Sequence, residues 1–388
     1  MLGETSIVND VRIEKWVYGG DALARIDGRV VLAPFTLPGE LARIDIHDDI
    51  HADLNEIVEP APERVEPPCP IFARCGGCHY QHAPYEFQLA RKVEILREQL
   101  RRVGKIDYQG EIDTISGPPL EYRNRSQFHI ADGRIGYLAW RSHDLVEVKD
   151  RCPISSPRVN ETLALIRERM QDPHFPRFVR ELEIFTNETE VQVNAIETER
   201  PLARAFYDSL NSVVALEYST AHGNFRVSPH SFFQVNRFLI DPMIDRAVAR
   251  AEGDTALDLY SGVGLFALPL SKKFQKVTAV ESGTSAIRDL QYNAPQVAAD
   301  QSRAEDYLAK LTATPDFVLA DPPRAGLGKS VVAHLKRLAP PRITIVSCDP
   351  ATLARDVAAL AYKIDRVTLI DLFPQTYHIE TIVELTSA

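Results

Sequence analysis

A cysteine near the C-terminal end of the chain has neighbours that suit a chemical role. Cys348 is the only cysteine after Cys152, and it stands in Ser347-Cys348-Asp349-Pro350, between an apolar run typical of a strand and a run typical of a helix. A free cysteine is by default a small buried hydrophobic residue. A thiol at the end of a strand and just before a helix N-terminus is instead a candidate nucleophile, because the field of the helix favours the thiolate.

Three other segments place glycines or acids at the ends of strand-like runs. The run 255–260 is followed by Gly262 and Gly264, the next run ends at Glu281, and a third ends at Asp321 before two prolines. Ligands of a doubly wound sheet bind outside the carboxyl ends of its strands, where glycines admit a cofactor and an acid takes ribose hydroxyls. The two prolines restrict the backbone at and before them, which would hold Asp321 at this edge.

The glycine segment differs from a dinucleotide fingerprint. The position three after Gly264 is Ala267, so the G-x-G-x-x-G pattern is incomplete. The last two strand-like runs, 366–373 and 379–387, are separated by a loop too short for a helical crossover, so one of them is predicted to run antiparallel, which is unusual in dinucleotide folds. S-adenosylmethionine fits better, because this methyl donor needs an adenosine pocket without a pyrophosphate cradle.

A thiol beside a methyl donor indicates methylation of a carbon that is not itself nucleophilic, as in a pyrimidine ring. Addition of Cys348 to carbon 6 of uracil would make carbon 5 an enolate-like nucleophile that takes the methyl group. A base must then remove the carbon 5 proton so that the thiol is eliminated. Glu380, in the loop that leads into the last strand, is the candidate base.

Four cysteines form a separate group in the first half of the chain. Cys69, Cys75 and Cys78 are close together, with two glycines between the second and third, and Cys152 is distant. In a reducing compartment such a group favours metal binding over disulfides. Four thiolates satisfy either zinc or an iron–sulfur cluster, so the spacing leaves both open.

The composition is that of a soluble globular protein. A length of 388 residues predicts two or three domains. No apolar run approaches the ~20 residues of a membrane span, and the N-terminus lacks a signal-peptide pattern, so we expect a cytoplasmic protein with no membrane partner. A monomer with no obligate protein partner is the default expectation. The net charge of −10 argues against bulk coating of nucleic acid. The basic stretch 91–105 is best interpreted as a solvated face of an amphipathic helix.

The pattern along the chain predicts three domains. Residues 1–58 alternate short apolar runs with turn signals, as in a small β-barrel, and a proline-rich joint at 59–70 reads as a linker. Residues 59–227 have a mixed α+β pattern. Residues 228–388 alternate strands and helices, which predicts a doubly wound parallel α/β sheet covered by helices on both faces. The central elements expected are helices near 84–103 and 157–171, hairpin strands within 123–149, and a second hairpin turning at Asn187.

In combination, these segments resemble a known family, the S-adenosylmethionine-dependent RNA 5-methyluridine (uracil-5) methyltransferases of the tRNA and 23S rRNA type. The motifs that carry the resemblance span nearly the whole chain. They are CPIFARCGGCHYQH at 69–82, YRNR at 122–125, SFFQVN at 231–236, DLYSGVGLF at 258–266, DPPRAGL at 321–327, SCDPATLARD at 347–356 and HIET at 378–381.

The resemblance implies a class I methyltransferase domain, with a Rossmann-like sheet, over residues 228–388. Within it, Cys348 would be the nucleophile and Glu380 the proton-abstracting base. The residues implied to contact S-adenosylmethionine are Gln234, Tyr260, Glu281 and Asp321.

The same resemblance implies that residues 1–58 form a TRAM module, an OB-like barrel of the kind that binds oligonucleotides. It also tilts the metal site toward a 4Fe-4S cluster within 59–227. The partner would be RNA, either rRNA or tRNA, with 23S rRNA favoured. Arg123, Arg125 and the 91–105 helix would hold phosphates around a uridine flipped out of its stack. The cluster ligands would be Cys69, Cys75, Cys78 and Cys152.

Three positions depart from the family pattern. Ser261 stands where family members often have cysteine, Leu265 replaces an asparagine, and Asp349 stands where asparagine is common. We expect these changes to preserve catalysis and to mark a subgroup with its own RNA substrate. Two other classes compete: a methyltransferase for a non-RNA acceptor, which would have little use for the barrel or for a thiol and base, and a catalytically inactive RNA-binding homologue, which should have lost the nucleophile or the base.

Overall fold

The chain folds into two compact units, each built from segments that are far apart in the sequence. The computed structural model describes residues 7–387. The first unit comprises residues 7–96, Tyr137–Val148 and Phe373–His378, and the second comprises Arg97–Gly136, Lys149–Leu372 and 379–387. The division into domains at residues 58 and 227 stays a prediction.

The first unit contains the β-rich segment expected at the N-terminus. Its five antiparallel strands pair in the order β3-β2-β1-β4-β5. The backbone amide of Leu32 on β3 donates to the carbonyl of Ile50 just before β5 at 2.7 Å, so the sheet curls until its edges meet. The strands are β1 (Ile7–Trp16), β2 (Asp21–Ile26), β3 (Arg29–Pro34), β4 (Leu41–Ile46) and β5 (Ala52–Glu59).

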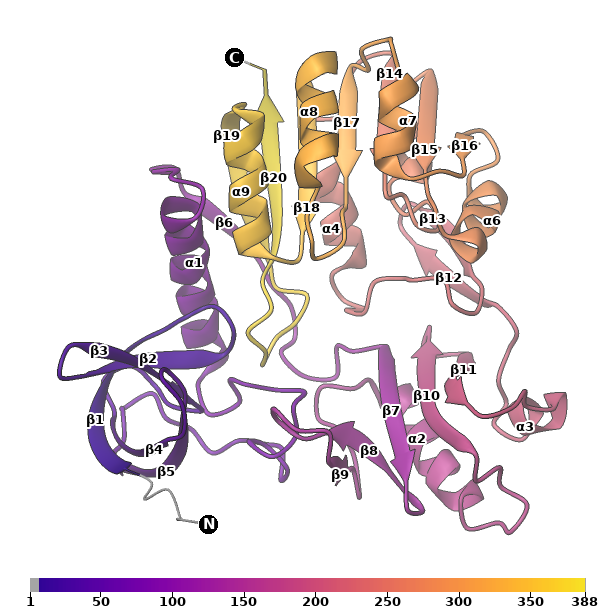
Figure 1. Ribbon diagram of the computed structural model, residues 1–388. Coiled ribbons are helices and arrows are strands. Elements are labelled where there is room, and N and C mark those ends of the chain that lie inside the picture. Colours follow the sequence, from indigo (N-terminus) through magenta and orange to yellow (C-terminus); the bar gives the residue numbers. More distant parts are fainter. Residues whose placement is uncertain (1–6, 388) are drawn as a thin grey trace. The chain divides into compact units, whose positions relative to one another are not determined.

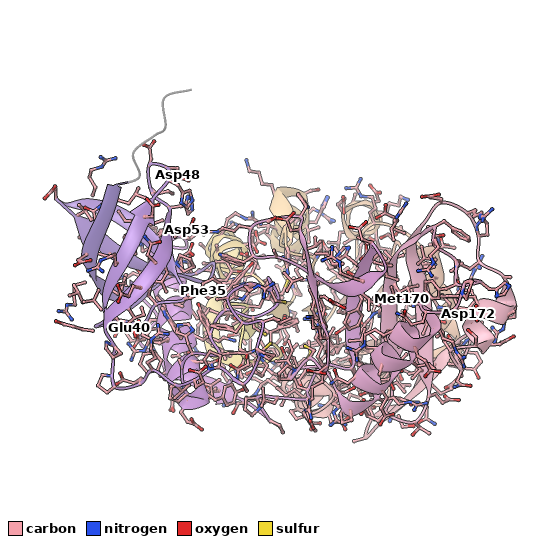
Figure 2. The ribbon with its side chains drawn as sticks, turned by 90° about the horizontal axis from the view of Figure 1, so that it is seen from below. Phe35, Glu40, Asp48, Asp53, Met170 and Asp172 are labelled. Carbon is pink, nitrogen blue, oxygen red and sulfur yellow. The ribbon has the colours of Figure 1, made fainter. Side chains whose placement is uncertain are left out.

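A buried carboxylate fastens the proline-rich segment 59–70 to this barrel. Glu40 is fully buried (Figure 2) and accepts hydrogen bonds from the backbone amide of Leu37 at 2.7 Å and from Arg64 Nε at 2.5 Å. Burial would raise the pKa of Glu40, but the bonds from Arg64 and Leu37 hold it below its ordinary value. The segment predicted as a linker is therefore attached to the barrel through Arg64.

The middle of the chain contains the helices and hairpins that its pattern predicts. The basic stretch lies on α1 (Tyr85–Arg102), and the turn at Asn187 joins β10 to β11. In the second unit, antiparallel β7 pairs with both β8 and β10. The remaining elements are β6 (Ile112–Ile115), β7 (Arg125–Ala131), β8 (Arg134–Leu138), β9 (Leu145–Glu147), α2 (Pro157–Arg169), β10 (Val179–Thr186), β11 (Val191–Thr198), α3 (Arg204–Asp208), β12 (Leu216–Thr220) and β13 (Gly223–Val227).

The second unit is organised by an eight-stranded sheet of order β16-β15-β14-β17-β18-β20-β19-β6 (Figure 1). The five strands β16, β15, β14, β17 and β18 are mutually parallel. Strand β20 runs antiparallel to both of its neighbours, as the short closing loop predicts. Its strands and helices are α4 (Ile240–Ala247), β14 (Thr255–Leu259), α5 (Ala267–Leu270), β15 (Lys276–Val280), α6 (Thr284–Asn293), β16 (Ala298–Asp300), α7 (Ala304–Lys310), β17 (Phe317–Ala320), α8 (Gly328–Leu338), β18 (Arg342–Ser347), α9 (Pro350–Leu360), β19 (Lys363–Ile370) and β20 (Glu380–Thr386).

Burial explains why the central strands read as continuous apolar runs. All four residues of β17 are buried, and so are five of the six in β18. Such strands are covered on both faces. Helices α8 and α9 lie on the near face of the sheet in Figure 1, and α4 lies on the opposite face. The arrangement confirms the predicted doubly wound α/β class.

Several details differ from the sequence prediction. Of residues 265–274, only Ala267–Leu270 form a helix, α5, and a regular helix cannot begin at 265 because Pro269 lacks the N–H that would bond to the Leu265 carbonyl. Short α4 and α7 were not predicted, and neither was β6, which joins the far edge of the sheet by pairing with β19. Within residues 7–387, no helix combines the length and apolar character that a bilayer crossing requires.

Candidate active site

The candidate site residues of the second unit meet on one edge of the eight-stranded sheet. Strands β15, β14, β17 and β18 are parallel and adjacent, so their carboxyl ends lie side by side. The residues that directly follow those four ends are, in the same order, Glu281, Tyr260, Asp321 and Cys348. Because β20 is antiparallel, its first residue, Glu380, reaches the same edge.

Strand register brings the candidate nucleophile close to the candidate base. Ser347 is the last residue of β18 and pairs with Thr381 of β20. Cys348 and Glu380 are the next residue beyond this last pair on each strand, and they lie close enough for the charge of Glu380 to act on the thiol. Glu380 is 5% exposed and Cys348 is half-buried. A thiol and a carboxyl group therefore share one edge, with the thiol open to an incoming substrate.

Burial has the largest effect on the pKa of the Cys348 thiol. Burial raises the pKa of Cys348 to about 12, with Glu380 and Asp321 adding to the effect and Arg324 opposing it. Asp349 is the N-cap of α9, and its carboxylate accepts from the backbone amides of Ala351 and Thr352 at 3.0 and 2.8 Å. Whether the field of α9 favours the thiolate stays a prediction, and burial outweighs any such effect in setting the pKa of Cys348.

The two acids facing the thiol are perturbed in the same direction. Burial raises the pKa of Asp321 to about 7. Burial also raises the pKa of Glu380 well above its ordinary value, with Asp321 adding to this effect and Arg324 opposing it. Two neighbouring carboxyl groups in a low-dielectric site cannot both ionise freely. Burial and mutual repulsion therefore both oppose ionisation of these two acids.

Arg324 is a site residue that the motif search did not single out. It follows the Asp-Pro-Pro segment, its side chain is exposed, and its charge lowers the pKa of both Cys348 and Glu380. The Thr352 hydroxyl on α9 donates to the Arg324 carbonyl at 3.2 Å, which ties this loop to the helix behind the nucleophile. The feature of the sequence that could have identified Arg324 is its position directly after the rigid Asp-Pro-Pro turn.

The acid at the end of the next strand hydrogen-bonds to the backbone of the glycine segment. Glu281 accepts from the backbone amides of Gly262 at 2.9 Å and Gly283 at 2.6 Å, one bond to each carboxylate oxygen. Tyr260 has a φ of +60°, which turns the chain sharply as it leaves β14. Burial raises the pKa of its phenol to about 12. These bonds fix the loop on the edge where the sequence predicted a cofactor.

Asp258 is a second residue that sequence reasoning left out of the site. It lies on β14, is fully buried, and neither carboxylate oxygen has a hydrogen bond of good geometry among the residues that the structure describes, although the backbone amide of Ala267 lies near enough to oppose the rise in its pKa. Burial raises its pKa well above the ordinary value, with the charges of Asp321 and Glu281 adding to the effect. A buried acid with no partner is costly, so this carboxyl group is suited to a ligand that supplies a donor or a positive charge.

Gln234 is held by pairing between two of the motif segments. The amide of Asn124 donates to the Val235 carbonyl at 3.0 Å, and the amide of Arg237 donates to the Tyr122 carbonyl at the same distance. The YRNR and SFFQVN segments therefore run alongside each other, a contact between residues more than a hundred positions apart. Gln234 itself is 6% exposed.

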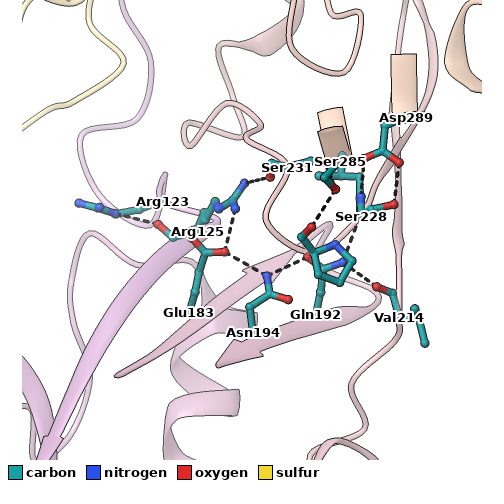
Figure 3. A network of polar contacts seen from close by, with 12 residues as sticks. Arg123, Arg125, Glu183, Gln192, Asn194, Val214, Ser228, Ser231, Ser285 and Asp289 are labelled. Carbon is teal, nitrogen blue, oxygen red and sulfur yellow. Dashed lines mark hydrogen bonds and ion pairs between the residues drawn. The ribbon is translucent and has the colours of Figure 1, made fainter. Parts of the chain in front are cut away.

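A buried polar network continues from this segment and corrects the expected role of Arg125 (Figure 3). Arg125 is 8% exposed, donates to the Ser231 carbonyl at 2.8 Å and forms an ion pair with Glu183 at 2.8 Å. The Ser231 hydroxyl in turn donates to Asp289 at 2.6 Å. Arg125 is therefore not a phosphate ligand, because its guanidinium is already paired inside the second unit. Arg123, whose Nε donates to the Arg125 carbonyl, is only partly buried.

The basic stretch on α1 is used mostly within the protein. Lys92 is fully buried and donates to the Phe373 carbonyl at 3.0 Å in the first unit. Arg97 donates to the carbonyls of Tyr108 and Gly110 in the second unit. The interpretation of 91–105 as a solvated face fits the exposed Arg101 and Arg102 but not Lys92 and Arg97, which hydrogen-bond within the protein.

The four early cysteines are not seen as a single site. Cys75 and Cys78 are buried and Cys69 is partly buried in the first unit, whereas the buried Cys152 belongs to the second. The amide of Gly77 points at Cys75 Sγ at 3.4 Å, as in loops that wrap a bound thiolate. Across residues 7–387, no three His, Cys, Asp or Glu side chains are grouped so as to hold a metal ion. The cluster stays a prediction.

Comparison with known proteins was informative at the level of sequence and of fold. The sequence model of the tRNA (uracil-5-)-methyltransferase family matches residues 162–303 and 303–388. An RNA methyltransferase of Aquifex aeolicus is 32% identical over 415 residues, covering 96% of this chain and 97% of the relative. The 23S rRNA (uracil(1939)-C(5))-methyltransferase RlmD of Pectobacterium atrosepticum is 31% identical over 407 residues, covering 93% and 90%.

A solved structure has the same fold along nearly the full length. The Pyrococcus abyssi tRNA (uracil-54, C5)-methyltransferase, in complex with S-adenosyl-L-homocysteine, superimposes with a TM-score of 0.79 and 24% identity, covering 97% of this chain and all of that one. The α/β architecture described above is therefore shared with that enzyme.

Proposed function

This chain belongs to the tRNA (uracil-5-)-methyltransferase family, and from that premise we propose that it methylates carbon 5 of a specific uridine through a covalent adduct with Cys348. As a member of this family it is an S-adenosylmethionine-dependent RNA (uracil-5-)-methyltransferase. The proposed mechanism is supported by the antiparallel pairing of β18 and β20, whose last pair is Ser347 and Thr381 and which brings Cys348 and Glu380 to the same edge of the sheet.

The first step is addition of Cys348 Sγ to carbon 6 of the uracil. The thiol gives up its proton to water, the new S–C bond forms, and the electron pair of the 5,6 double bond moves to carbon 5 and the carbonyl at carbon 4. The raised pKa of Cys348 opposes this step. Arg324 favours it, because its charge stabilises the thiolate.

Carbon 5 then attacks a methyl group, and a base completes the reaction. S-adenosylmethionine supplies that methyl as an electrophile and leaves as S-adenosylhomocysteine. Glu380 removes the remaining proton from carbon 5, the electron pair restores the double bond, and the bond from carbon 6 to Cys348 breaks. The buried carboxyl of Glu380, with its raised pKa, is a strong enough base for this task once ionised.

The residues present fit the methyl donor. Gly262 and Glu281 form a closed loop at the carboxyl ends of β14 and β15, where an acid can take ribose hydroxyls. The unpartnered oxygens of Asp258 suit the positive charge of the donor's amino-acid portion. Gln234, Tyr260 and Asp321 are the other proposed contacts.

We further propose 23S rRNA as the substrate in preference to tRNA. This proposal is supported by the 31% identity to two RlmD enzymes, those of Pectobacterium atrosepticum and Halomonas elongata, whose names specify uracil 1939 of 23S rRNA. The first-unit barrel would act as a TRAM-like RNA-binding module.

The four early cysteines are proposed to bind a 4Fe-4S cluster. The donor set is chemically suitable, since buried thiols and a Gly76-Gly77 turn with an amide aimed at sulfur are typical of such sites. Anaerobic purification followed by iron, sulfide and zinc analysis tests this. Stoichiometric zinc without iron would contradict it, and Cys152→Ser should lower the iron content.

The mechanism is tested with RNA that contains 5-fluorouridine. Fluorine cannot leave as a proton, so incubation with S-adenosylmethionine should trap a protein–RNA adduct that survives denaturation. Cys348→Ser should give none, whereas Cys152→Ser should retain the adduct-forming thiol. A 23S rRNA fragment should compete for the adduct better than tRNA does. Failure of the parent protein to form any adduct with total cellular RNA would refute the mechanism.

A further inference from the structure

Residues from the early part of the chain hydrogen-bond to the loop that leads to Glu380 and pack against it. Strand β19 ends at Ile370, and residues 373–378 then belong to the first unit before the chain returns to β20. Glu380 follows this loop after a single intervening residue, Ile379. Glu380 is paired with Ile370 of β19, so the loop that joins these two residues sets the path by which the chain enters β20.

Two glutamine side chains form a reciprocal pair inside this loop. Gln88 Nε2 donates to Gln375 Oε1 at 2.9 Å, and the backbone amide of Gln375 donates to Gln88 Oε1 at 3.1 Å. Gln88 also donates to the carbonyls of Tyr80 and Ala83. Gln88 is fully buried and Gln375 is 7% exposed, so these bonds are made away from water.

The backbone of the loop is held as firmly as its side chains. The amides of His79 and Tyr80 both donate to the Gln375 carbonyl, at 2.8 and 3.0 Å, and Lys92 donates to the Phe373 carbonyl. Gln375 has a φ of +68°, a conformation that disfavours residues other than glycine. Such a conformation persists only where surrounding contacts enforce it, and it is enriched at functional sites.

Aromatic packing around Tyr377 holds the C-terminal end of the loop in place. The ring of Tyr377 lies 4.6 Å from that of His79 and 5.9 Å from that of Tyr18, centroid to centroid. Gly20, at a φ of +99°, makes room for it, since a side chain there would come within 3.0 Å of Tyr377 Cδ1. The loop is thus fixed at its start, middle and end.

We propose that Gln88 and Gln375 are positioning residues for the catalytic base, acting on proton removal from carbon 5 and not on thiol addition. Cys348 is anchored independently, because it lies between β18 and α9 and the N-cap Asp349 fixes the start of that helix. Loosening the loop would displace Glu380 while leaving Cys348 in place. This inference rests on the proposed function, since it concerns the third chemical step of that reaction.

The consequence is a step-specific defect. With the base displaced, Cys348 still adds to uracil and carbon 5 still accepts the methyl group, but elimination of the thiol slows by about a hundredfold, as for a misplaced catalytic group. Methylated RNA should then stay covalently attached to the protein, even when the RNA contains ordinary uridine.

The test uses Gln88→Met, which keeps the length of the side chain but removes its hydrogen bonds. The readouts are labelled methyl transferred in the first turnover, the denaturant-stable RNA–protein adduct formed on ordinary substrate RNA, and kcat. We expect a normal first turnover, an accumulated adduct carrying the methyl label, and a kcat and KM that fall together while kcat/KM stays close to that of the parent protein. Gln375→Gly is the second variant, because glycine accepts the left-handed backbone while losing the side-chain pair.

Thr36→Val is the matched control. It removes another buried hydrogen bond of the first unit, that from the Thr36 hydroxyl to the Ala33 carbonyl, without touching the loop. It should accumulate no adduct. If both glutamine variants turn over like the parent, or lose the first turnover and kcat together without an adduct, the positioning role is refuted while the proposed function stands. If the parent forms no adduct with 5-fluorouridine RNA, both proposals fail.

Discussion

The pKa of Cys348 gives a prediction that can be measured without RNA. An unperturbed thiol has a pKa of 9.0, and the value near 12 for Cys348 leaves about one-thousandth as much thiolate at neutral pH. A thiolate of higher pKa is intrinsically more reactive, with a Brønsted coefficient of about 0.4–0.5, so part of this loss is recovered. The net expectation is a thiol that reacts roughly thirty to sixty times more slowly than an ordinary cysteine.

The reactivity of Cys348 is measured as a function of pH on the protein without cofactor. A neutral aromatic disulfide is added between pH 6.5 and 10.5, and the mixed disulfide at Cys348 is quantified by peptide mass spectrometry, which separates it from the other four cysteines. The rate should rise about tenfold for each pH unit and show no plateau near pH 9. The same peptide in urea-denatured protein supplies the reference rate and should level off near its ordinary pKa.

A paired substitution tests the electrostatic cause. Arg324→Met removes the charge that opposes the rise in pKa, so Cys348 should react still more slowly, whereas Arg324→Lys should behave like the parent protein. Limited access of the reagent to the half-buried thiol would lower the reaction rate by the same factor at every pH and would not move the inflection of the rate–pH curve. An inflection at or below pH 9 in the native protein would refute the reasoning.

Three further perturbations have outcomes set by the structure. Burial raises the pKa of Asp321 to about 7, so the unfolded chain ionises this group first and stability should fall as pH rises from about 4 to 7; thermal unfolding of Asp321→Asn should show a shallower fall. Asp258→Asn, which cannot ionise, should stabilise the cofactor-free protein at pH 8 yet weaken S-adenosylmethionine binding measured by calorimetry, and equal affinity would exclude Asp258 from the donor site. Asp349→Ala removes the N-cap of α9 and should lower the free energy of unfolding in urea by about 1 kcal/mol.

The fold class and the edge that carries the site could be predicted from local patterns. Strand and helix periodicity is a local property, and in parallel sheets it places the residues after each strand on a common edge. For this reason the sequence alone predicts that Glu281, Asp321 and Cys348 share one edge of the sheet. The antiparallel closing pair followed from the length of a single loop.

What the sequence by itself determined were thus the types of residue and their order along strands, since both are encoded within short windows. Only the tertiary structure decided the strand pairing that brings Cys348 and Glu380 to the same edge, the burial of Arg125 against Glu183 and the unpartnered state of Asp258. The hydrogen bond between Gln88 and Gln375, two residues 287 positions apart, likewise depends on the tertiary structure. Such contacts depend on how distant segments pack, and the desolvation that sets the pKa of a thiol or an acid exists only once that packing has excluded water.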